Sequence, residues 1–206
     1  MTNGKFSLKV DRYLRAMETL INYLLQFGDL NQQQIRLIEN KAVLRELKKG
    51  QIYAEAGIIP KEIIFLTEGI FRIYYYNHNG DQITKYFIDE NNFIVDINSY
   101  NQGIPSSEYA DTITDCKFIV FSKEAFHELS MVIIPWDGIF GKITAKALAE
   151  KVNKISAMRP EDATERYLNF LKIFPSLANR IPLSYLASYL GITQSSLSRI
   201  RKNISG

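Results

Sequence analysis

The chain has 206 residues, of which 46% are hydrophobic and 23% charged, and its formal net charge is +3. A chain of this length and apolar content can bury a core without disulfides or metals. Its single cysteine, Cys116, excludes an intrachain disulfide, a cysteine-rich zinc site and a four-cysteine iron–sulfur cluster. The charge is unevenly distributed, because residues 167–206 hold five basic residues and no acidic one, whereas residues 1–166 have a net charge of −2. A basic tail on a slightly acidic body predicts a polyanionic partner for the tail.

The start of the chain carries no apolar signal segment, and no stretch reaches about 18 apolar residues. We therefore expect a cytoplasmic protein that does not use a membrane. The two histidines, His78 and His127, lack metal-ligand spacing, so we expect no metal site and no cofactor. A jelly-roll enzyme that depends on a metal is disfavoured for the same reason, and we predict that the protein is not an enzyme.

The first 121 residues predict two helices followed by short strands. Apolar residues at helical spacing indicate a helix over 8–27, and Asn31 can cap a second helix that runs to about residue 40. Residues 77–80, Asn-His-Asn-Gly, predict a hairpin turn, because Asn and Gly tolerate positive φ. The predicted strands cover residues 63–66, 70–76, 82–88, 93–95 and 116–121. Many short strands at close spacing favour a sandwich, jelly roll or barrel.

The rest of the chain reads as helical. Ser122 can cap one helix, and a long helix is predicted from Pro135 to about Met158. The apolar stripe of this long helix is wider than one sheet face needs, so it is interpreted as pairing with a second copy, and packing on its own domain is the alternative. Arg159-Pro160 breaks it. Further helices are expected over 161–173, after Pro182 and after Ile192.

The tail contains a pattern that is typical of two helices crossing through a short turn. Leu186 and Leu190 lie one helical turn apart, and Ala187 is small, as a close crossing requires. Gly191 can supply a left-handed turn, and Thr193 can cap the next helix. These features predict a helix-turn-helix.

The second of these helices turns Leu197 and Ile200 toward the first and leaves a polar, basic side exposed. Polar groups near its start can reach base edges, and its basic residues can bind phosphate or guanine. Ser184 and Tyr185 on the preceding helix are placed to reach the DNA backbone. A helical hairpin used for protein contact is the alternative. The residues predicted to contact double-stranded DNA are Thr193, Gln194, Ser195, Ser196, Ser198, Arg199, Arg201 and Lys202.

The order of a β-rich domain, a long helix and a C-terminal helix-turn-helix resembles the Crp/Fnr family of bacterial transcription regulators. The resemblance is most specific over residues 187–200, and residues 47–69 resemble the start of the cyclic-nucleotide-binding jelly roll of the family. It implies an α+β fold with a sensor domain over 1–134, a dimerisation helix over 135–158 and a DNA-binding domain over 159–206. It further implies a homodimer on a palindromic site and makes RNA polymerase a candidate partner. Family members usually continue into a β-hairpin wing, whereas this sequence stops at Gly206, so we expect either that an N-terminal strand pair alone supports the helix-turn-helix or that the wing is lost.

The sequence departs from the family at the phosphate cassette, where nucleotide-binding members carry Gly-Glu and, after a loop, Arg, Ser or Thr, and Ala. Asp96 aligns with the Glu, and Ser106, Ser107 and Glu108 align with the Arg, Ser/Thr and Ala. Since the Arg neutralises the cyclic phosphate, we predict that the chain does not bind cyclic AMP in the family manner.

The effector is left open between three alternatives. The two serines could donate hydrogen bonds to an uncharged ligand or a carboxylate, and Glu108 could favour a cation. Alternatively, the cavity is filled by aromatic side chains of the protein itself, namely Phe71, Tyr74, Tyr86 and Phe87. A ligand- or protein-binding module without specific DNA binding is the competing function.

Overall fold

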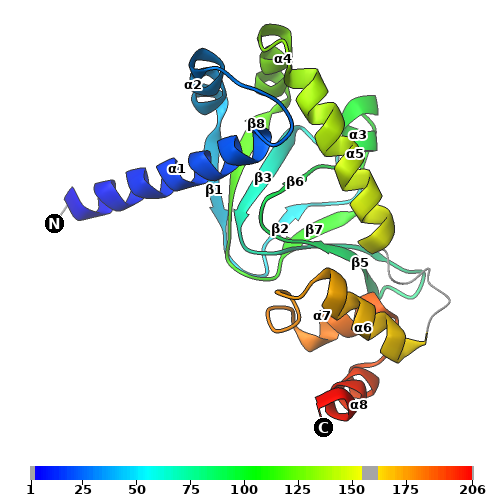
Figure 1. Cartoon of the computed structure of the whole chain (residues 1–206). Helices are drawn as coiled ribbons and strands as arrows, with labels where there is room; N and C mark the ends of the chain where they lie inside the picture. The colour runs from blue at the N-terminus through cyan, green and yellow to red at the C-terminus, as the bar shows by residue number, and fades with distance from the viewer. Residues whose placement is uncertain (1–2, 155–161, 206) are drawn as a thin grey trace.

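The structure of the protein, a computed structural model, describes residues 3–154 and 162–205 (Figure 1). Helices α1 (Asn3–Leu24) and α2 (Gln32–Lys41) precede the strands, and helix α3 (Ile97–Gln102) interrupts them. The strands are β1 (Val43–Leu47), β2 (Ile52–Ala54), β3 (Glu62–Glu68), β4 (Phe71–Tyr76), β5 (Gln82–Ile88), β6 (Asn92–Ile94), β7 (Tyr109–Thr112) and β8 (Cys116–Ser122). The remaining helices are α4 (Lys123–Val132), α5 (Trp136–Lys154), α6 (Ala163–Ile173), α7 (Leu183–Leu190) and α8 (Gln194–Ser205).

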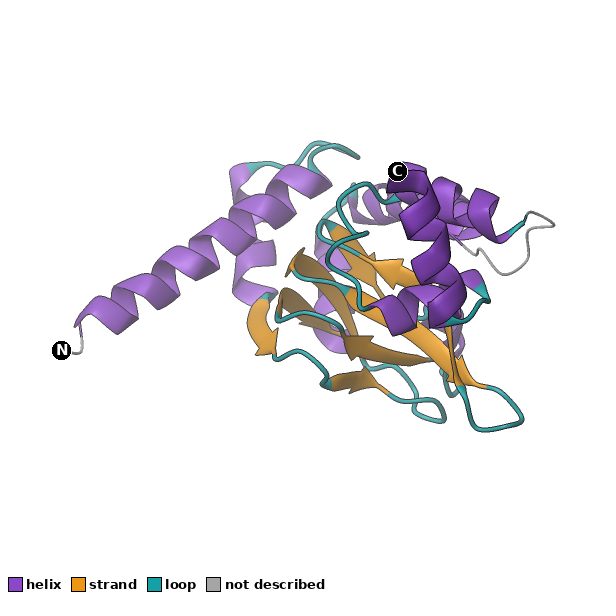
Figure 2. Cartoon of the chain, turned by 90° about the horizontal axis from the view of Figure 1, so that it is seen from below, coloured by secondary structure: helices purple, strands orange, loops and turns teal. Residues whose placement is uncertain are grey.

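The strands form two four-stranded antiparallel sheets with the orders β1-β8-β3-β6 and β2-β7-β4-β5. The sheets face each other as a sandwich (Figure 2), and apolar side chains from both fill the space between them. Tyr53, Phe71 and Phe118 meet there edge to face, with ring centroids 5.7–5.8 Å apart. The buried side chains between the sheets include Ile64, Leu66, Ile73, Ile94, Ala110 and Val120.

Helices α1, α2, α4 and α5 cover the outer side of the first sheet. Trp136, the only tryptophan, is fully buried in this layer, where its ring lies 5.4 Å from that of Phe126 and 4.7 Å from that of Phe140. The N-terminal half of α1 projects away from the sandwich in both views (Figures 1 and 2). The apolar residues of this layer include Met17, Leu20, Leu24, Ile38, Phe65, Ile119 and Leu129.

Residues 162–205, called here the C-terminal unit, contain α6, α7 and α8 and no strand. They share a core to which the sandwich contributes Ile70, Phe87 and Ile113. Helix α7 lies against β5, so the C-terminal unit is seated on the second sheet (Figure 1). The buried residues that the unit itself provides include Tyr167, Phe170, Phe174, Leu177, Leu186, Tyr189, Leu190 and Leu197.

The predicted α+β class is confirmed, and most predicted elements are present. Asn31 caps α2 in a reciprocal box with Gln34, and Ser122 caps α4 by accepting the Ala125 N–H. The predicted turn is present with Gly80 at φ +82°. Helix α1 extends earlier than predicted, and residues 155–158 of the predicted long helix lie outside the described residues. The prediction missed β1, β2, β7 and α3.

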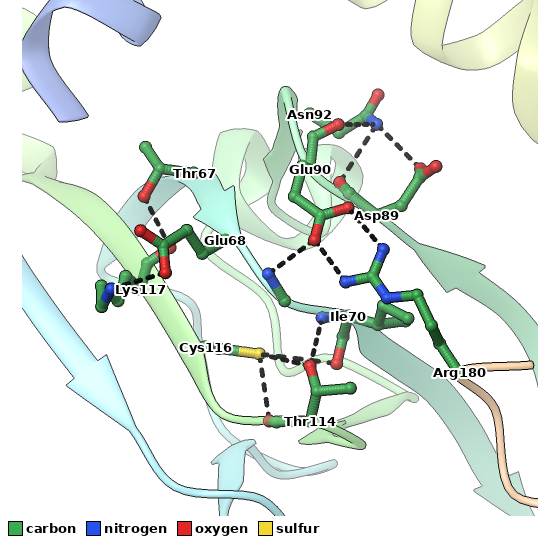
Figure 3. Close-up of polar contacts among 11 residues, drawn as sticks. Thr67, Glu68, Ile70, Asp89, Glu90, Asn92, Thr114, Cys116, Lys117 and Arg180 are labelled. Carbon is green, nitrogen blue, oxygen red and sulfur yellow. Dashed lines mark hydrogen bonds and ion pairs between the residues drawn. The ribbon is translucent and has the colours of Figure 1, made fainter. Parts of the chain in front are cut away.

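Helices α1 and α5 are the longest in the described part of the chain, and neither they nor the shorter ones are long and apolar enough to cross a membrane. Cys116 is buried, with its Sγ 3.5 Å from the Ile70 carbonyl oxygen (Figure 3). Burial raises the pKa of this thiol, which suits a packed rather than a reactive cysteine.

Candidate functional site

Helices α7 and α8 form a tight helix–turn–helix arrangement. Gly191 ends α7 in the left-handed conformation at φ +66°, and its N–H donates to the carbonyl groups of Ala187 and Ser188. The Thr193 hydroxyl accepts the Ser196 N–H at 3.2 Å, so Thr193 caps α8 as predicted. Leu197 is fully buried against α7, which fixes the rotation of α8 about its axis.

That rotation leaves one side of α8 facing solvent. Its exposed residues are one helical turn or one position apart, so they share one surface. We call this surface the α8 polar face, and it consists of Gln194, Ser195, Ser198, Arg199 and Lys202. Ser196 is half-buried, and its N–H and hydroxyl both contact the Thr193 hydroxyl, so Thr193 and Ser196 take part in the cap of α8.

Arg201, which is also predicted to contact DNA, points into the C-terminal unit. Its Nη2 donates to the Ala178 carbonyl at 3.0 Å, and its guanidinium lies 5.6 Å from the centre of the Tyr167 ring. Arg201 follows Leu197 by one helical turn, and this spacing places it beside the buried side of α8. Its role in the structure is therefore to brace the unit, and it is not part of the α8 polar face.

The second region of interest is the cassette-like segment between Asp96 and Glu108. Asp96 caps α3, and its carboxylate accepts the Ser99 N–H at 3.2 Å and the Ser99 and Ser106 hydroxyls at 2.8 and 2.9 Å. Burial alone would raise the pKa of Asp96, but these hydrogen bonds, helped by Lys151, hold the pKa below its usual value. The Asp96 carboxylate is thus already engaged by Ser99 and Ser106 at the start of α3.

Glu108 completes this segment from the other side. Its carboxylate forms an ion pair with Lys85 and accepts the Tyr86 hydroxyl at 3.4 Å, and its backbone N–H donates to the Ser106 hydroxyl at 3.1 Å. Burial and the neighbouring Glu108 raise the pKa of Tyr86. The Lys151 Nζ from α5 lies 5.0 Å from the centre of the Tyr86 ring. Three of the four predicted effector residues are therefore in one network.

Comparisons with known proteins agree with this geometry. Residues 44–131 match the family model of the cyclic nucleotide-binding domain. This segment is therefore similar to cyclic nucleotide-binding domains. No curated protein sequence is detectably similar to the chain.

The similarity of the chain to solved structures extends beyond residues 44–131. FixK2 from Bradyrhizobium japonicum is 15% identical with a TM-score of 0.68, covering 80% of this chain and 84% of that chain. The c-di-GMP-responsive global regulator CLP of Xanthomonas campestris is 14% identical with a TM-score of 0.66, covering 85% and 92%. A protein from Eubacterium rectale assigned to the Crp/Fnr family of transcriptional regulators is 18% identical with a TM-score of 0.67, covering 89% and 88%. The chain therefore has the Crp/Fnr-type fold that the sequence resemblance predicts.

Within residues 44–131, the remaining residues of the predicted effector pocket lie apart. Ser107 is exposed. The four aromatic residues expected to fill one cavity do not share one: Phe71 lies between the sheets, whereas Phe87 lies in the core of the C-terminal unit. Tyr74 stacks on Tyr109 at 5.2 Å, and Tyr86 contacts Glu108. The alternation of side chains along β5 explains why Tyr86 and Phe87 point to opposite sides.

Sequence reasoning missed a buried ion pair on the second sheet. The Arg72 side chain is 2% exposed and binds Asp111 through two bonds, Nε to Oδ1 at 3.0 Å and Nη2 to Oδ2 at 2.5 Å. Its guanidinium lies 4.2 Å from the centre of the Tyr74 ring and 3.8 Å from that of Tyr185. Tyr185, which is predicted to reach the DNA backbone, has its ring against Arg72 of the sandwich. The only sequence signal was an arginine among aromatic residues in a predicted strand.

A polar cleft of about 970 Å³ opens between α1, α5, α6 and the turn from β5 to β6. Amide side chains of Asn22, Gln26, Asn91 and Asn92 line it together with Lys146. Among the residues that the structure describes, no cluster of three or more His, Cys, Asp or Glu side chains could hold a metal ion there or elsewhere.

Proposed function

We propose that the protein is a DNA-binding transcription regulator in which α8 is the recognition helix. The observation that carries this proposal is the α8 polar face, which presents Arg199 and Lys202 to solvent on a helix-turn-helix. The described part of the tail after Tyr167 contains no acidic residue that would repel the phosphate backbone. The Crp/Fnr-type fold supports transcription regulation as the general role.

In this proposal α8 enters the major groove with its N-terminal end toward the bases. Gln194 and Ser195 stand at that end, where side chains of a recognition helix reach base edges. Arg199, one helical turn beyond Ser195, is placed to contact guanine or phosphate, and a bidentate contact to guanine contributes about 1–3 kcal/mol of discrimination. Lys202 lies farther along and is assigned to the phosphate backbone.

A homodimer through α5 fits the exposed side of that helix. Gly138, Gly141 and Ala145 are exposed and small, and a Cβ built on either glycine would meet nothing within 4 Å apart from its chain neighbours and the adjacent backbone of its own helix. Leu148 is 53% exposed and continues the same side. Small residues permit a close approach of two helices, and two copies of α8 would then read half-sites whose centres lie about 34 Å apart.

We further propose that the segment 44–131, which is similar to cyclic nucleotide-binding domains, does not bind cyclic AMP in the family manner. Ser106, which aligns with the family arginine, is already engaged with Asp96, and Glu108 adds a second carboxylate beside the phosphate position. Losing one partner of a buried charge pair costs on the order of 3–5 kcal/mol, a factor of hundreds or more in affinity. Calorimetric titration with cyclic AMP should therefore show no binding in the low-micromolar range, and such binding would contradict this part of the proposal.

The DNA-binding role is tested by selection from random double-stranded DNA, followed by gel shifts with the enriched sequences. We expect a two-fold symmetric consensus bound far more tightly than scrambled DNA. Failure to enrich any sequence, together with no salt-dependent binding to random DNA, would favour the competing interpretation of a ligand- or protein-binding module.

A further inference from the structure

Strand β5 lies at the edge of its sheet, because it pairs with β4 on one side only. A free edge presents unpaired N–H and C=O groups, which natural proteins usually cover or block. Here α7 runs against that edge (Figure 1). The helix that supports α8 is therefore also the cover of a strand in the sandwich.

One side chain makes this contact specific. The Ser188 hydroxyl accepts the Thr84 N–H at 3.0 Å and donates to the Gln82 carbonyl at 3.1 Å. A hydroxyl has one proton to donate and lone pairs to accept, so it can make both bonds at once. Ser188 thus occupies the place on the β5 edge that a neighbouring strand would fill.

Two further contacts flank Ser188 on the C-terminal unit. On one side, the Tyr185 ring stacks on the Arg72 guanidinium at 3.8 Å, and Arg72 is itself held by Asp111. An arginine held flat against an aromatic ring in a buried setting gives a directional contact. On the other side, the buried rings of Phe87 and Tyr189 pack 5.4 Å apart.

The third contact lies just past the end of β5 (Figure 3). Glu90 accepts the Gly69 N–H at 2.9 Å, and its carboxylate is also bound by both terminal nitrogens of Arg180, one of them at 3.0 Å. Arg180 belongs to the loop that leads into α7. A bidentate arginine–carboxylate pair fixes orientation as well as distance.

From these contacts we propose that Ser188, Tyr185 and Arg180 form an interdomain latch that seats the C-terminal unit on β5 in the free protein. The latch uses α7 and its preceding loop, so it leaves the α8 polar face uncovered and sets its direction relative to the sandwich. Strand β5 also carries Lys85 and Tyr86, which contact Glu108 of the cassette-like segment. The latch therefore joins that segment to the helix-turn-helix through one strand.

The latch is tested by amide hydrogen exchange, followed residue by residue by NMR on the full chain without DNA. Ser188→Ala removes the acceptor of the Thr84 N–H, and we expect exchange at Thr84 to become about fivefold faster or more. Ser184→Ala is the matched control, because Ser184 is an exposed serine on the same helix. Unchanged exchange at Thr84 in Ser188→Ala, or equal acceleration in the control, would overturn the proposal.

A second pair of variants distinguishes release of the latch from a general folding defect. Tyr185→Phe keeps the ring on Arg72, whereas Tyr185→Leu removes it, so only the leucine variant should accelerate exchange at Thr84. Acceleration confined to β5 and α7, with the β3–β8 amides unchanged, identifies release of the latch, whereas equal rates in both variants refute it. No DNA is present in this experiment, so its result does not depend on whether the protein binds DNA. If the latch proposal fails, the DNA-binding proposal is still decided by its own experiment.

Discussion

The buried pair of Arg72 and Asp111 gives the sharpest stability prediction. The side chains are only 2% and 10% exposed, and they are joined by two hydrogen bonds in a fork-like arrangement. Asp111→Asn keeps the shape of the side chain but removes its charge. The guanidinium would then remain buried between two tyrosine rings with only neutral partners, including Gln82, whose Oε1 accepts from Nη2 at 2.8 Å.

Removing one partner of such a pair costs about 3–5 kcal/mol, because the remaining charge is left buried without compensation. Asparagine still offers one oxygen to the guanidinium, so we expect the lower end, about 3 kcal/mol. With a urea slope of about 2 kcal/mol per molar, the midpoint of unfolding should fall by about 1.5 M.

Trp136 provides the probe, since it is the only tryptophan and is fully buried. Its fluorescence during urea unfolding reports the sandwich, under the condition that unfolding is cooperative. The control is Asp115→Asn, because Asp115 pairs with Lys48 at an exposed position and should leave the midpoint near that of the parent chain. Equal midpoints for the two variants would refute the assignment of Arg72–Asp111 as a major stabilising pair.

Three further predictions concern the helices and the latch. Arg201→Ala should lower the stability of the C-terminal unit by about 1–2 kcal/mol in thermal unfolding, because it removes the hydrogen bond that Arg201 donates to the Ala178 carbonyl. Lys202→Ala should leave the stability unchanged. Leu148→Glu should convert a dimer to a monomer in sedimentation velocity, whereas the same change at the exposed Leu168 should leave the dimer intact. Burial would raise the pKa of Glu90, but Arg180 and Gly69 hold it below 4.5. The contribution of this ion pair to stability is therefore present above pH 4.5 and lost as the pH falls through the lowered pKa, and an NMR titration giving a pKa of 4.5 or higher would contradict it.

The parts of the fold that were predictable are those whose causes are local. Gly191 and Thr193 mark the turn because their backbone and capping requirements act within four residues. Strand β7 was missed because its buried members include Asp111 and Thr112, which are polar. They are buried because Arg72 and the Lys48–Gln51 backbone satisfy them from distant parts of the chain.

The candidate site likewise has parts that local sequence patterns predict and parts that they do not. The exposed side of α8 followed from helical periodicity, whereas the inward turn of Arg201 depends on Ala178 and Tyr167 in another helix. The role of Tyr185 depends on Arg72 of β4, and that of Ser188 depends on the edge of β5, in both cases about one hundred positions earlier in the sequence. Contacts of this kind leave no periodic pattern in the sequence, because the local spacing of apolar and polar residues around each partner does not depend on the other partner.

The central claim is that the α8 polar face binds DNA, and its most direct test is an anisotropy titration of labelled, selected DNA. Arg199→Ala should weaken binding by about 1–3 kcal/mol, or roughly five- to 150-fold, and should reduce discrimination against scrambled DNA. Arg12→Ala is the matched control, because Arg12 is an exposed arginine on α1, far from α8 in the fold (Figure 1). Equal affinities for the selected DNA in the parent chain and in Arg199→Ala would contradict the assignment of α8 as the recognition helix.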